Sequence, residues 1–319
     1  MRKILSVVAL MLVLVMALAS CGGGLTNLTM GTGGSQGTYY AFGGVLSQYI
    51  SNNTGVSCTA VPSGGSKGNL QGIAAGDYQL GFVQTDVMAY AWNGTNTFEK
   101  EGKIDSFRVV GGLYAEAVQL VTTNPDIKTV ADLRGKSVSV GDPGSGVYFN
   151  AMDVLAAAGL TENDIKAQYL DFGGSADGLQ DGKIDAAFIV AGAPTTAVVQ
   201  LMTAKEAYLV PIDGEFAAKI MESCPYYTEY VIPAGTYAGQ DTDVKTITVK
   251  ATLIVSADVD EDTVYNLTKA IFDNVDAIKA EHAKGAELTI ENATSGITAP
   301  FHKGAARYFA EKGVTVVTE

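Results

Sequence analysis

An internal repeat constrains the fold of this chain more than any other feature of its sequence. The matched windows are residues 28–40 with 138–150, residues 64–71 with 173–180, and residues 76–83 with 182–190. In the first pair, the glycine-rich MGTGGSQG lies against VGDPGSG. Three matched segments in one order, with offsets that drift only from 110 to 106 residues, predict two lobes built on one plan.

Each copy of the repeat has the pattern strand, glycine-rich loop, helix, strand, loop, helix, strand, which is typical of a parallel sheet covered by helices. Each first helix is predicted to pack one apolar face in the core, formed by Phe42, Val45, Leu46, Tyr49 and Ile50 in one copy and by Tyr148, Met152 and Leu155 in the other. Gly55 and Gly159 are expected to end these helices.

Two copies are too few for a solenoid, so we expect two lobes that face each other across a cleft. The first crossing is expected near residue 117, between a strand over residues 107–114 and another over residues 117–122. The return crossing is expected in the β-rich residues 245–255. Lobe I would then comprise residues 28–117 and about 250–319, and lobe II residues 118–249.

The N-terminal residues have the layout of an export signal. Arg2 and Lys3 precede an apolar run over residues 4–19, which is shorter than the roughly 20 residues that span a bilayer. The run ends at LASC, which resembles the lipobox of bacterial lipoproteins. We expect residues 1–20 to be a signal peptide, Cys21 to carry lipid and residues 21–27 to form a tether. The alternative is an uncleaved anchor helix, and both place the rest of the chain outside the cytoplasm.

Composition excludes several partners. Without residues 1–20 the chain has 19 basic and 34 acidic residues, a net charge of −15, which disfavours nucleic acid. Cys58 and Cys224 are expected to be core thiols in different lobes, with a disulfide between them as the alternative. The cysteines and the two histidines, His282 and His302, have no metal-site spacing, and we expect both histidines on the surface.

The repeat also locates a candidate binding site. In each copy a glycine-rich loop leads into a helix start, whose unpaired N–H groups and partial positive charge form an anion site. Ser35, Thr38, Ser145 and Tyr148 add hydroxyl groups there. Two such termini on one cleft would hold a small anion, with closure by hinge motion. The alternative is that the glycines only shape tight turns.

No motif for catalysis or for a cofactor stands out. Residues 31–37 approximate a dinucleotide fingerprint with one extra residue, and no phosphate loop follows. No nucleophile elbow with a partner for its serine is apparent. The acids Asp258, Asp260, Glu261 and Asp262 are interpreted as a helix start. We therefore expect no catalytic residue, no cofactor and no metal ion.

The glycine-rich opening GTGGSQGTYY, followed by Gly43-Gly44, resembles the opening motif of the TAXI-type solute-binding proteins of TRAP transporters. Further segments resemble that family in the same order: GGS with NL at residues 64–70, FVQTDV at 82–87, LYAE at 113–116, VSVGDPGSG at 138–146, DAAFIVAGAPT at 185–195 and IPAGTY at 232–237. The resemblance spans residues 28 to about 312, and its specificity lies in the order of many motifs.

This resemblance implies an α/β fold of the type II periplasmic-binding-protein kind, with two lobes, each a mixed sheet flanked by helices, and a ligand cleft between them. It implies a monomeric lipoprotein on the outer face of the cell membrane that hands a glutamate-like amino acid or another organic acid to integral membrane subunits of a TRAP transporter. The implied ligand-binding residues are Gly33, Gly34, Ser35, Thr38, Gln84, Tyr114, Ser145, Gly146, Asn150, Ala191 and Gly192. The chain departs from the family pattern at Ala115 and Val147.

The positions of the charged residues indicate, independently of the family resemblance, how a carboxylate ligand would be bound. The only arginines are Arg2, Arg108, Arg134 and Arg307, and none lies in a repeated loop, so amides and hydroxyls would bind a carboxylate. Lys67, beside a repeated loop, is expected to be solvated. A binding lipoprotein of an ABC importer, a ligand-sensing subunit of a receptor and an exported enzyme are the alternatives, and the sequence shows no nucleophile–base pair for the last.

Overall fold

The computed structural model describes residues 26–319 of the chain. The predicted signal peptide (residues 1–20), the lipid-bearing Cys21 and residues 22–25 of the predicted tether lie outside these residues. The last residue assigned to the tether, Asn27, already begins the first strand. None of the helices in residues 26–319 is long and apolar enough to cross a membrane.

The two copies of the repeat form two β-α-β-α-β units, as predicted. The first comprises β1 (Asn27–Gly31), α2 (Thr38–Thr54), β2 (Ser57–Val61), α3 (Ser66–Ala75) and β3 (Leu80–Gln84). The second comprises β5 (Ser137–Ser139), α5 (Gly146–Ala157), β6 (Lys166–Gln168), α6 (Phe172–Gln180) and β7 (Ala186–Ala191). In both units the first strand pairs in parallel with the other two, giving the orders β2-β1-β3 and β6-β5-β7.

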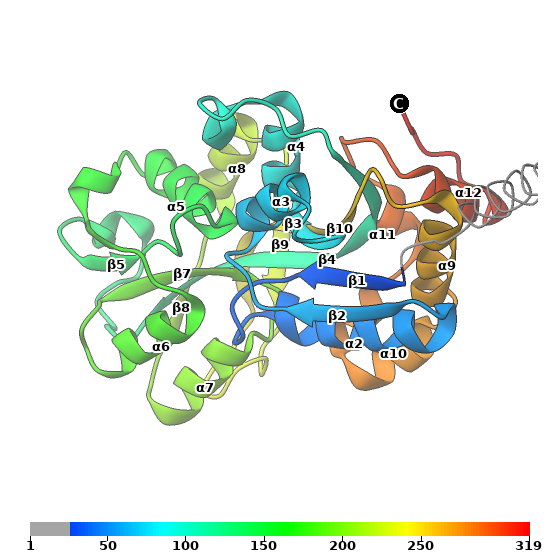
Figure 1. Ribbon diagram of the computed structural model, residues 1–319. Coiled ribbons are helices and arrows are strands. Elements are labelled where there is room, and N and C mark those ends of the chain that lie inside the picture. Colours follow the sequence, from blue (N-terminus) through cyan, green and yellow to red (C-terminus); the bar gives the residue numbers. More distant parts are fainter. Residues whose placement is uncertain (1–25) are drawn as a thin grey trace, which may run out of the picture.

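Two long strands join the units. β4 (Phe107–Thr122) and β10 (Val244–Ser256) pair with each other antiparallel, and each also pairs with the last strand of one unit, β10 with β3 and β4 with β7. The prediction of separate strands over residues 107–114 and 117–122 was wrong, because β4 continues without interruption. The hydrogen-bonded sheet therefore runs through the molecule in the order β2-β1-β3-β10-β4-β7-β5-β6 (Figure 1).

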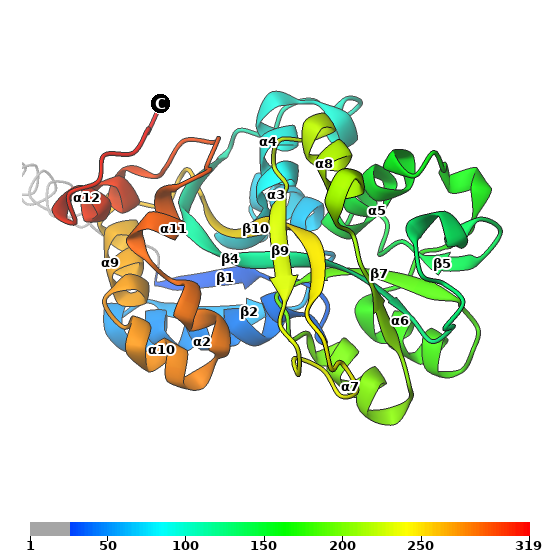
Figure 2. The ribbon, with the colours of Figure 1, turned by 180° about the vertical axis from the view of Figure 1, so that it is seen from behind.

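The other elements cover the sheet or extend it at its middle. β8 (Tyr208–Val210) pairs with β4, and β9 (Thr228–Ile232) pairs with β10, where it lies in front of the sheet in the view from behind (Figure 2). The remaining helices are α4 (Thr85–Asn93), α7 (Thr196–Ala204), α8 (Gly214–Ser223), α9 (Glu261–Phe272), α10 (Val275–Glu281), α11 (Ile290–Thr294) and α12 (Lys303–Glu311). Short 3-10 helices are η1 (Asn96–Phe98), η2 (Val130–Leu133), η3 (Glu162–Asp164) and η4 (Ala283–Glu287).

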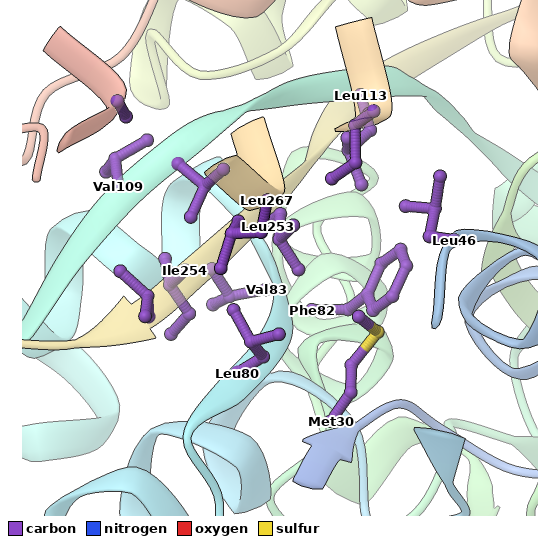
Figure 3. Packing of buried hydrophobic residues seen from close by; sticks show 14 of the residues in the cluster. Met30, Leu46, Leu80, Phe82, Val83, Val109, Leu113, Leu253, Ile254 and Leu267 are labelled. Atoms are coloured by element: carbon purple, nitrogen blue, oxygen red, sulfur yellow. The ribbon is translucent and has the colours of Figure 1, made fainter. Parts of the chain in front are cut away.

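Buried apolar side chains divide into clusters on the two sides of the molecule. The first cluster combines residues 28–114 with residues 251–309, so α9 and α12 pack against the first repeat unit. Figure 3 shows its centre, where Met30 and Phe82 from the N-terminal segment lie beside Leu253 of β10 and near Leu267 of α9. The other two clusters are drawn from residues 117–249. We refer to the part around the first cluster as lobe I and to the part around the others as lobe II.

Several local predictions can be compared with this fold. Gly55 ends α2 in the left-handed conformation, and Phe42, Leu46 and Ile50 are buried in the first cluster, as predicted. In α5 the predicted apolar face was shifted, because Val147, Val154 and Leu155 are buried whereas Tyr148 and Met152 are only partly buried. The structure confirms that the acids near residue 260 start a helix, since the Asp260 side chain caps α9.

The cysteines and histidines give a mixed outcome. Cys58 and Cys224 are buried free thiols in different clusters, as predicted. The surface position predicted for the histidines was wrong. His302 is 6% exposed, and its Nδ1 caps α12 by accepting from the Gly304 N–H, while His282 is half-buried and caps η4. Both histidines thus complete helix ends, which carry unpaired N–H groups.

Candidate ligand-binding site

A cavity between the lobes lies at the ends of the glycine-rich loops. Its volume is about 560 Å³, including its opening to solvent. Lobe I contributes Gly33, Gly34, Gly37, Thr38, Tyr39, Gly64, Gly65, Ser66, Gln84 and, from β4, Glu116; lobe II contributes Asp142, Ser145, Gly146, Val147, Leu170, Asp171, Phe172, Val190 and Ala191. Both copies of the repeated loop therefore face the same space.

The structure brings most of the sequence-predicted site residues to this cavity. Seven of them line it: Gly33, Gly34, Thr38, Gln84, Ser145, Gly146 and Ala191. Ser35 is exposed, and its side chain is not part of the lining. Tyr114, Asn150 and Gly192 also lie outside the lining, although each takes part in contacts close to it.

Five helices, α2 to α6, begin at residues that line the cavity, and three of them, α2, α3 and α5, follow glycine-rich loops. The residues at their N-termini are Gly37 before α2, Gly65 before α3 and Ser145 before α5. Gly37 and Gly65 provide no side-chain cap, and Gly65 has a φ of 83°, which suits glycine. The first N–H groups of a helix have no partner within it, so three N-termini place donors and partial positive charge around one space.

The hydroxyl groups predicted at the second loop have other partners. Ser145 caps α5, because its Oγ accepts from the Tyr148 N–H at 3.4 Å. The Tyr148 hydroxyl donates to Glu162 at 3.2 Å, away from the cavity. Of the four hydroxyl residues predicted for the two loops, Thr38 and Ser145 are therefore the ones that line the cavity.

The lobes touch at the two sides of the cavity. Thr38 Oγ1 of α2 donates to the Gly192 carbonyl, which follows β7, at 2.9 Å. Gly192 also leaves no room for a side chain, since an added Cβ would lie 3.1 Å from the Tyr114 ring. At the start of α5, a Cβ added to Gly146 would fall 1.6 Å from Gln84 Oε1. A side chain at either glycine of lobe II would force the neighbouring side chains of lobe I to move.

A buried carboxyl group forms the floor of the cavity. Glu116 on β4 is 2% exposed, and its Oε1 accepts from the Tyr39 hydroxyl at 2.5 Å. Its Oε2 has a longer contact, 3.5 Å, with Gln84 Nε2. Burial, the largest influence, raises the pKa of Glu116 to about 8. Sequence reasoning missed this residue, although an acid within the apolar run of residues 109–121 was a signal that could have found it.

Two polar atoms beside the cavity are buried without a partner. Gln84 Oε1 and the Tyr114 hydroxyl accept or donate no hydrogen bond in the structure. Buried polar groups are nearly always paired, so such atoms beside a cavity mark positions where a ligand atom or water would bond.

A second polar contact joins the lobes outside the cavity. Asn150 of α5, which the sequence predicted as a ligand residue, donates from Nδ2 to Asp86 Oδ2 of α4 at 2.9 Å and lies 2.7 Å from the Tyr227 hydroxyl. Tyr227 in turn donates to Asp153 at 2.9 Å. Burial raises the pKa of Asp86 to about 7. The structure thus places Asn150 in a contact between lobes.

Lys67 and groups that could hold a metal ion remain to be placed. Lys67 was expected to be solvated, but its ammonium group pairs with Glu101 at 2.6 Å and its side chain is 15% exposed. Within residues 26–319, no group of three or more His, Cys, Asp or Glu side chains is arranged to hold a metal ion.

Comparison with known proteins agrees with this architecture. The model of the NMT1-like family matches residues 30–313, which is most of the chain.

The chain belongs to the NMT1-like family.

Similarity to solved structures identifies the fold of this member of the NMT1-like family. The alkanesulfonate-binding protein SsuA from Xanthomonas axonopodis pv. citri, bound to MOPS, matches with a TM-score of 0.52 at 18% identity, over 91% of this chain and 85% of that chain. PhnD1 from Prochlorococcus marinus (MIT 9301), in complex with methylphosphonate, matches with a TM-score of 0.52 at 12% identity, over 78% of this chain and 84% of that chain. The fold is the type II periplasmic-binding-protein fold, as predicted.

Proposed function

We propose that this chain is an extracytoplasmic solute-binding lipoprotein that captures a small carboxylate, an amino acid or another organic acid, and delivers it to a TRAP-type secondary transporter. The observation that carries the proposal is the convergence of three helix N-termini, from both lobes, on one cavity. Helix N-termini bind anions with backbone N–H groups, so a carboxylate would be held without an arginine.

The cavity residues divide into two roles in this proposal. The direct contacts would be Gly33, Gly34, Thr38, Gln84, Ser145, Gly146 and Ala191, which line the cavity. Tyr114, Asn150 and Gly192 would act through the contacts between lobes. Ser35 stays a proposed contact only for a solute that reaches the mouth of the cavity, because its side chain is exposed.

Capture would use a hinge in the two long strands. β4 and β10 are the strands that pass between the hydrophobic clusters, and we place the lobe boundaries near residues 117 and 250 on them. Opening would break the bond between Thr38 and Gly192 and separate Gln84 from Gly146, while each hydrophobic cluster stayed intact. This is the hinge type of domain closure around a ligand.

The TRAP assignment and the lipid anchor on Cys21 rest on the order of sequence motifs and on the N-terminal layout. A binding lipoprotein for an ABC importer is the second candidate, because it would share the fold. Proteoliposomes that contain the membrane partner, loaded with solute by this protein, distinguish the two: a TRAP partner takes up solute under an ion gradient without ATP, and an ABC partner requires ATP.

Binding at the cavity is tested by calorimetry with single carboxylates. Thr38→Ala removes the hydroxyl that bonds Gly192 across the lobes, and we expect it to weaken binding about five- to tenfold, since a hydrogen bond contributes about 1 kcal/mol. Thr54→Ala is the matched control, because Thr54 also donates to a carbonyl, at 2.7 Å, but at the far end of α2. Equal affinity in both variants would contradict the assignment of this cavity.

A further inference from the structure

The side chains that line the cavity carry an unbalanced charge. Three carboxyl groups line it, those of Glu116, Asp142 and Asp171. Among the described residues, no lysine, arginine or histidine is part of the lining. Glu116 lies on the floor, whereas Asp142 is half-buried and Asp171 is exposed, both in lobe II.

The two nearest lysines each pair with a carboxylate outside the lining. Lys284 lies 5.7 Å from the Tyr114 ring centre and pairs with Glu287 at 2.7 Å. Lys67, whose Cδ lies near Gly144, pairs with Glu101 at 2.6 Å. The helix N-termini are therefore the source of positive potential within the lining, and they suit one carboxylate.

The floor of the cavity presents acceptors that lack a good donor. Gln84 Oε1 is buried without a partner, and Glu116 Oε2 has only the contact at 3.5 Å. Both residues are 2% exposed. Two adjacent acceptors of this kind are suited to a ligand group that donates several hydrogen bonds, and an ammonium group donates three.

We propose that the cavity selects its solute by charge: Glu116 and Gln84 accept an ammonium group, the helix N-termini hold a carboxylate, and a second carboxylate is rejected. The solute is then an amino acid with a neutral or basic side chain, and a glutamate-like diacid or dicarboxylate is disfavoured. This inference rests on the proposed function for the single carboxylate.

The acids at the mouth of the cavity oppose a second negative charge. Asp171 caps α6 by accepting from the Gly174 N–H at 2.7 Å, so its position is fixed. Burial, and after it the charge of Asp171, raises the pKa of Asp142. An anionic side chain that extends toward lobe II would meet both groups. A neutral side chain of the same shape would not be repelled. We therefore expect the site to distinguish solutes of the same shape and different charge, such as glutamine and glutamate.

A second consequence of an ammonium site at Glu116 is that solute binding releases a proton. The groups that face Glu116 are Tyr39 of α2, Gln84 of β3, Tyr114 of β4, Asp86 of α4 and Lys284 of η4, with Asp142 and Asp171 across the cavity. Burial and the charge of Asp86 raise the pKa of Glu116 to about 8, while its bonds with Tyr39 and Gln84 and the charge of Lys284 lower it. Arrival of an ammonium group favours the ionised form, so binding near pH 7 releases a proton from Glu116.

The test is calorimetric titration of residues 22–319, a span that contains all three hydrophobic clusters, with five probes. These are L-glutamine, L-glutamate, L-leucine, 4-methyl-2-oxopentanoate and putrescine. We expect L-glutamine or L-leucine to bind at least tenfold more tightly than L-glutamate and the 2-oxo acid. Titrations in two buffers of different ionisation enthalpy should show proton release.

Variants connect the result to the named acids. Glu116→Gln, which keeps an acceptor for Tyr39, should weaken amino-acid binding at least tenfold and remove the proton release. Asp171→Asn, which can still cap α6, should narrow the preference for glutamine over glutamate. Asp258→Asn removes the same charge at an exposed position outside the cavity and should change neither.

Each outcome decides a separate point. Tighter binding of L-glutamate or the 2-oxo acid overturns the charge selection and leaves the carboxylate function in place. Binding of putrescine alone refutes the carboxylate function and supports the role of Glu116. If no probe binds, the expected binding of L-glutamine or L-leucine fails and the charge selection is refuted, whereas a panel of other carboxylates tests the proposed function separately.

Discussion

Gly146→Ala should weaken solute binding by preventing full closure of the lobes. A Cβ at this position would lie 1.6 Å from Gln84 Oε1 and 2.4 Å from Gln84 Cδ. An ordinary contact needs about 3.4 Å or more, so the Gln84 amide would retreat by about 2 Å or the lobes would stay apart. Overpacking of this size costs about 1–3 kcal/mol, which corresponds to a roughly 5- to 150-fold higher Kd.

Calorimetry with a bound solute measures this loss, and thermal unfolding without solute separates closure from folding. The clash lies between lobe I and lobe II and leaves all three hydrophobic clusters unchanged, so the Tm without solute should change much less than the affinity. Gly44→Ala is the control, because no atom lies within 4 Å of a Cβ added there on α2. A Gly146→Ala protein with wild-type affinity would refute the closed contact between Gln84 and Gly146.

Three further changes have expected outcomes. Asp86→Asn should flatten the pH dependence of Tm. The pKa of Asp86 in the folded protein is raised to about 7, so the folded protein loses up to about 4 kcal/mol of stability as pH rises from about 4 through 7. An unchanged slope of Tm against pH would exclude Asp86 as the source of this dependence. Tyr237→Phe should lower the free energy of unfolding in denaturant by about 1–3 kcal/mol, because it removes the hydroxyl that accepts from the buried Thr195 N–H at 3.0 Å. Tyr208→Phe, at an exposed site, is the control. Asn69→Ala should also cost at least about 2 kcal/mol, because its amide bonds two buried carbonyls, at 2.7 and 2.8 Å; a loss below 0.5 kcal/mol would contradict that role.

The repeat made much of the fold predictable from sequence. Matched glycines and apolar runs gave two units with the same strand order, because spacing and turn residues are local properties of each copy. The continuous sheet was not predictable in the same way. Separate strands were expected on the two sides of residue 117, but β4 continues through this position, and Gly112 within β4 allows Asn292 and Lys250 to approach closely.

The sequence predicted the helix N-termini at the candidate site and three of the side chains that line the cavity, those of Thr38, Gln84 and Ser145. Glycine-rich loops identify helix N-termini, so the first loop and α5 were placed at the cavity. Side-chain partners depend on contacts between distant segments: Asn150 bonds to Asp86, 64 positions earlier, and Tyr148 bonds to Glu162. Glu116 lies outside the repeated segments, so the repeat did not identify it, although it is the only charged residue between Arg108 and Asp126.

The most direct test of the central claim, that the cavity between the lobes binds a small carboxylate, is a thermal-shift screen of residues 22–319. The panel would contain amino acids, 2-oxo acids, dicarboxylates and aromatic acids, after refolding to remove any bound solute. A solute at 100 times its Kd stabilises the protein by about 2.7 kcal/mol, so we predict a clear rise in Tm that Gln84→Ala or Ser145→Ala reduces. No rise with any carboxylate would contradict the claim.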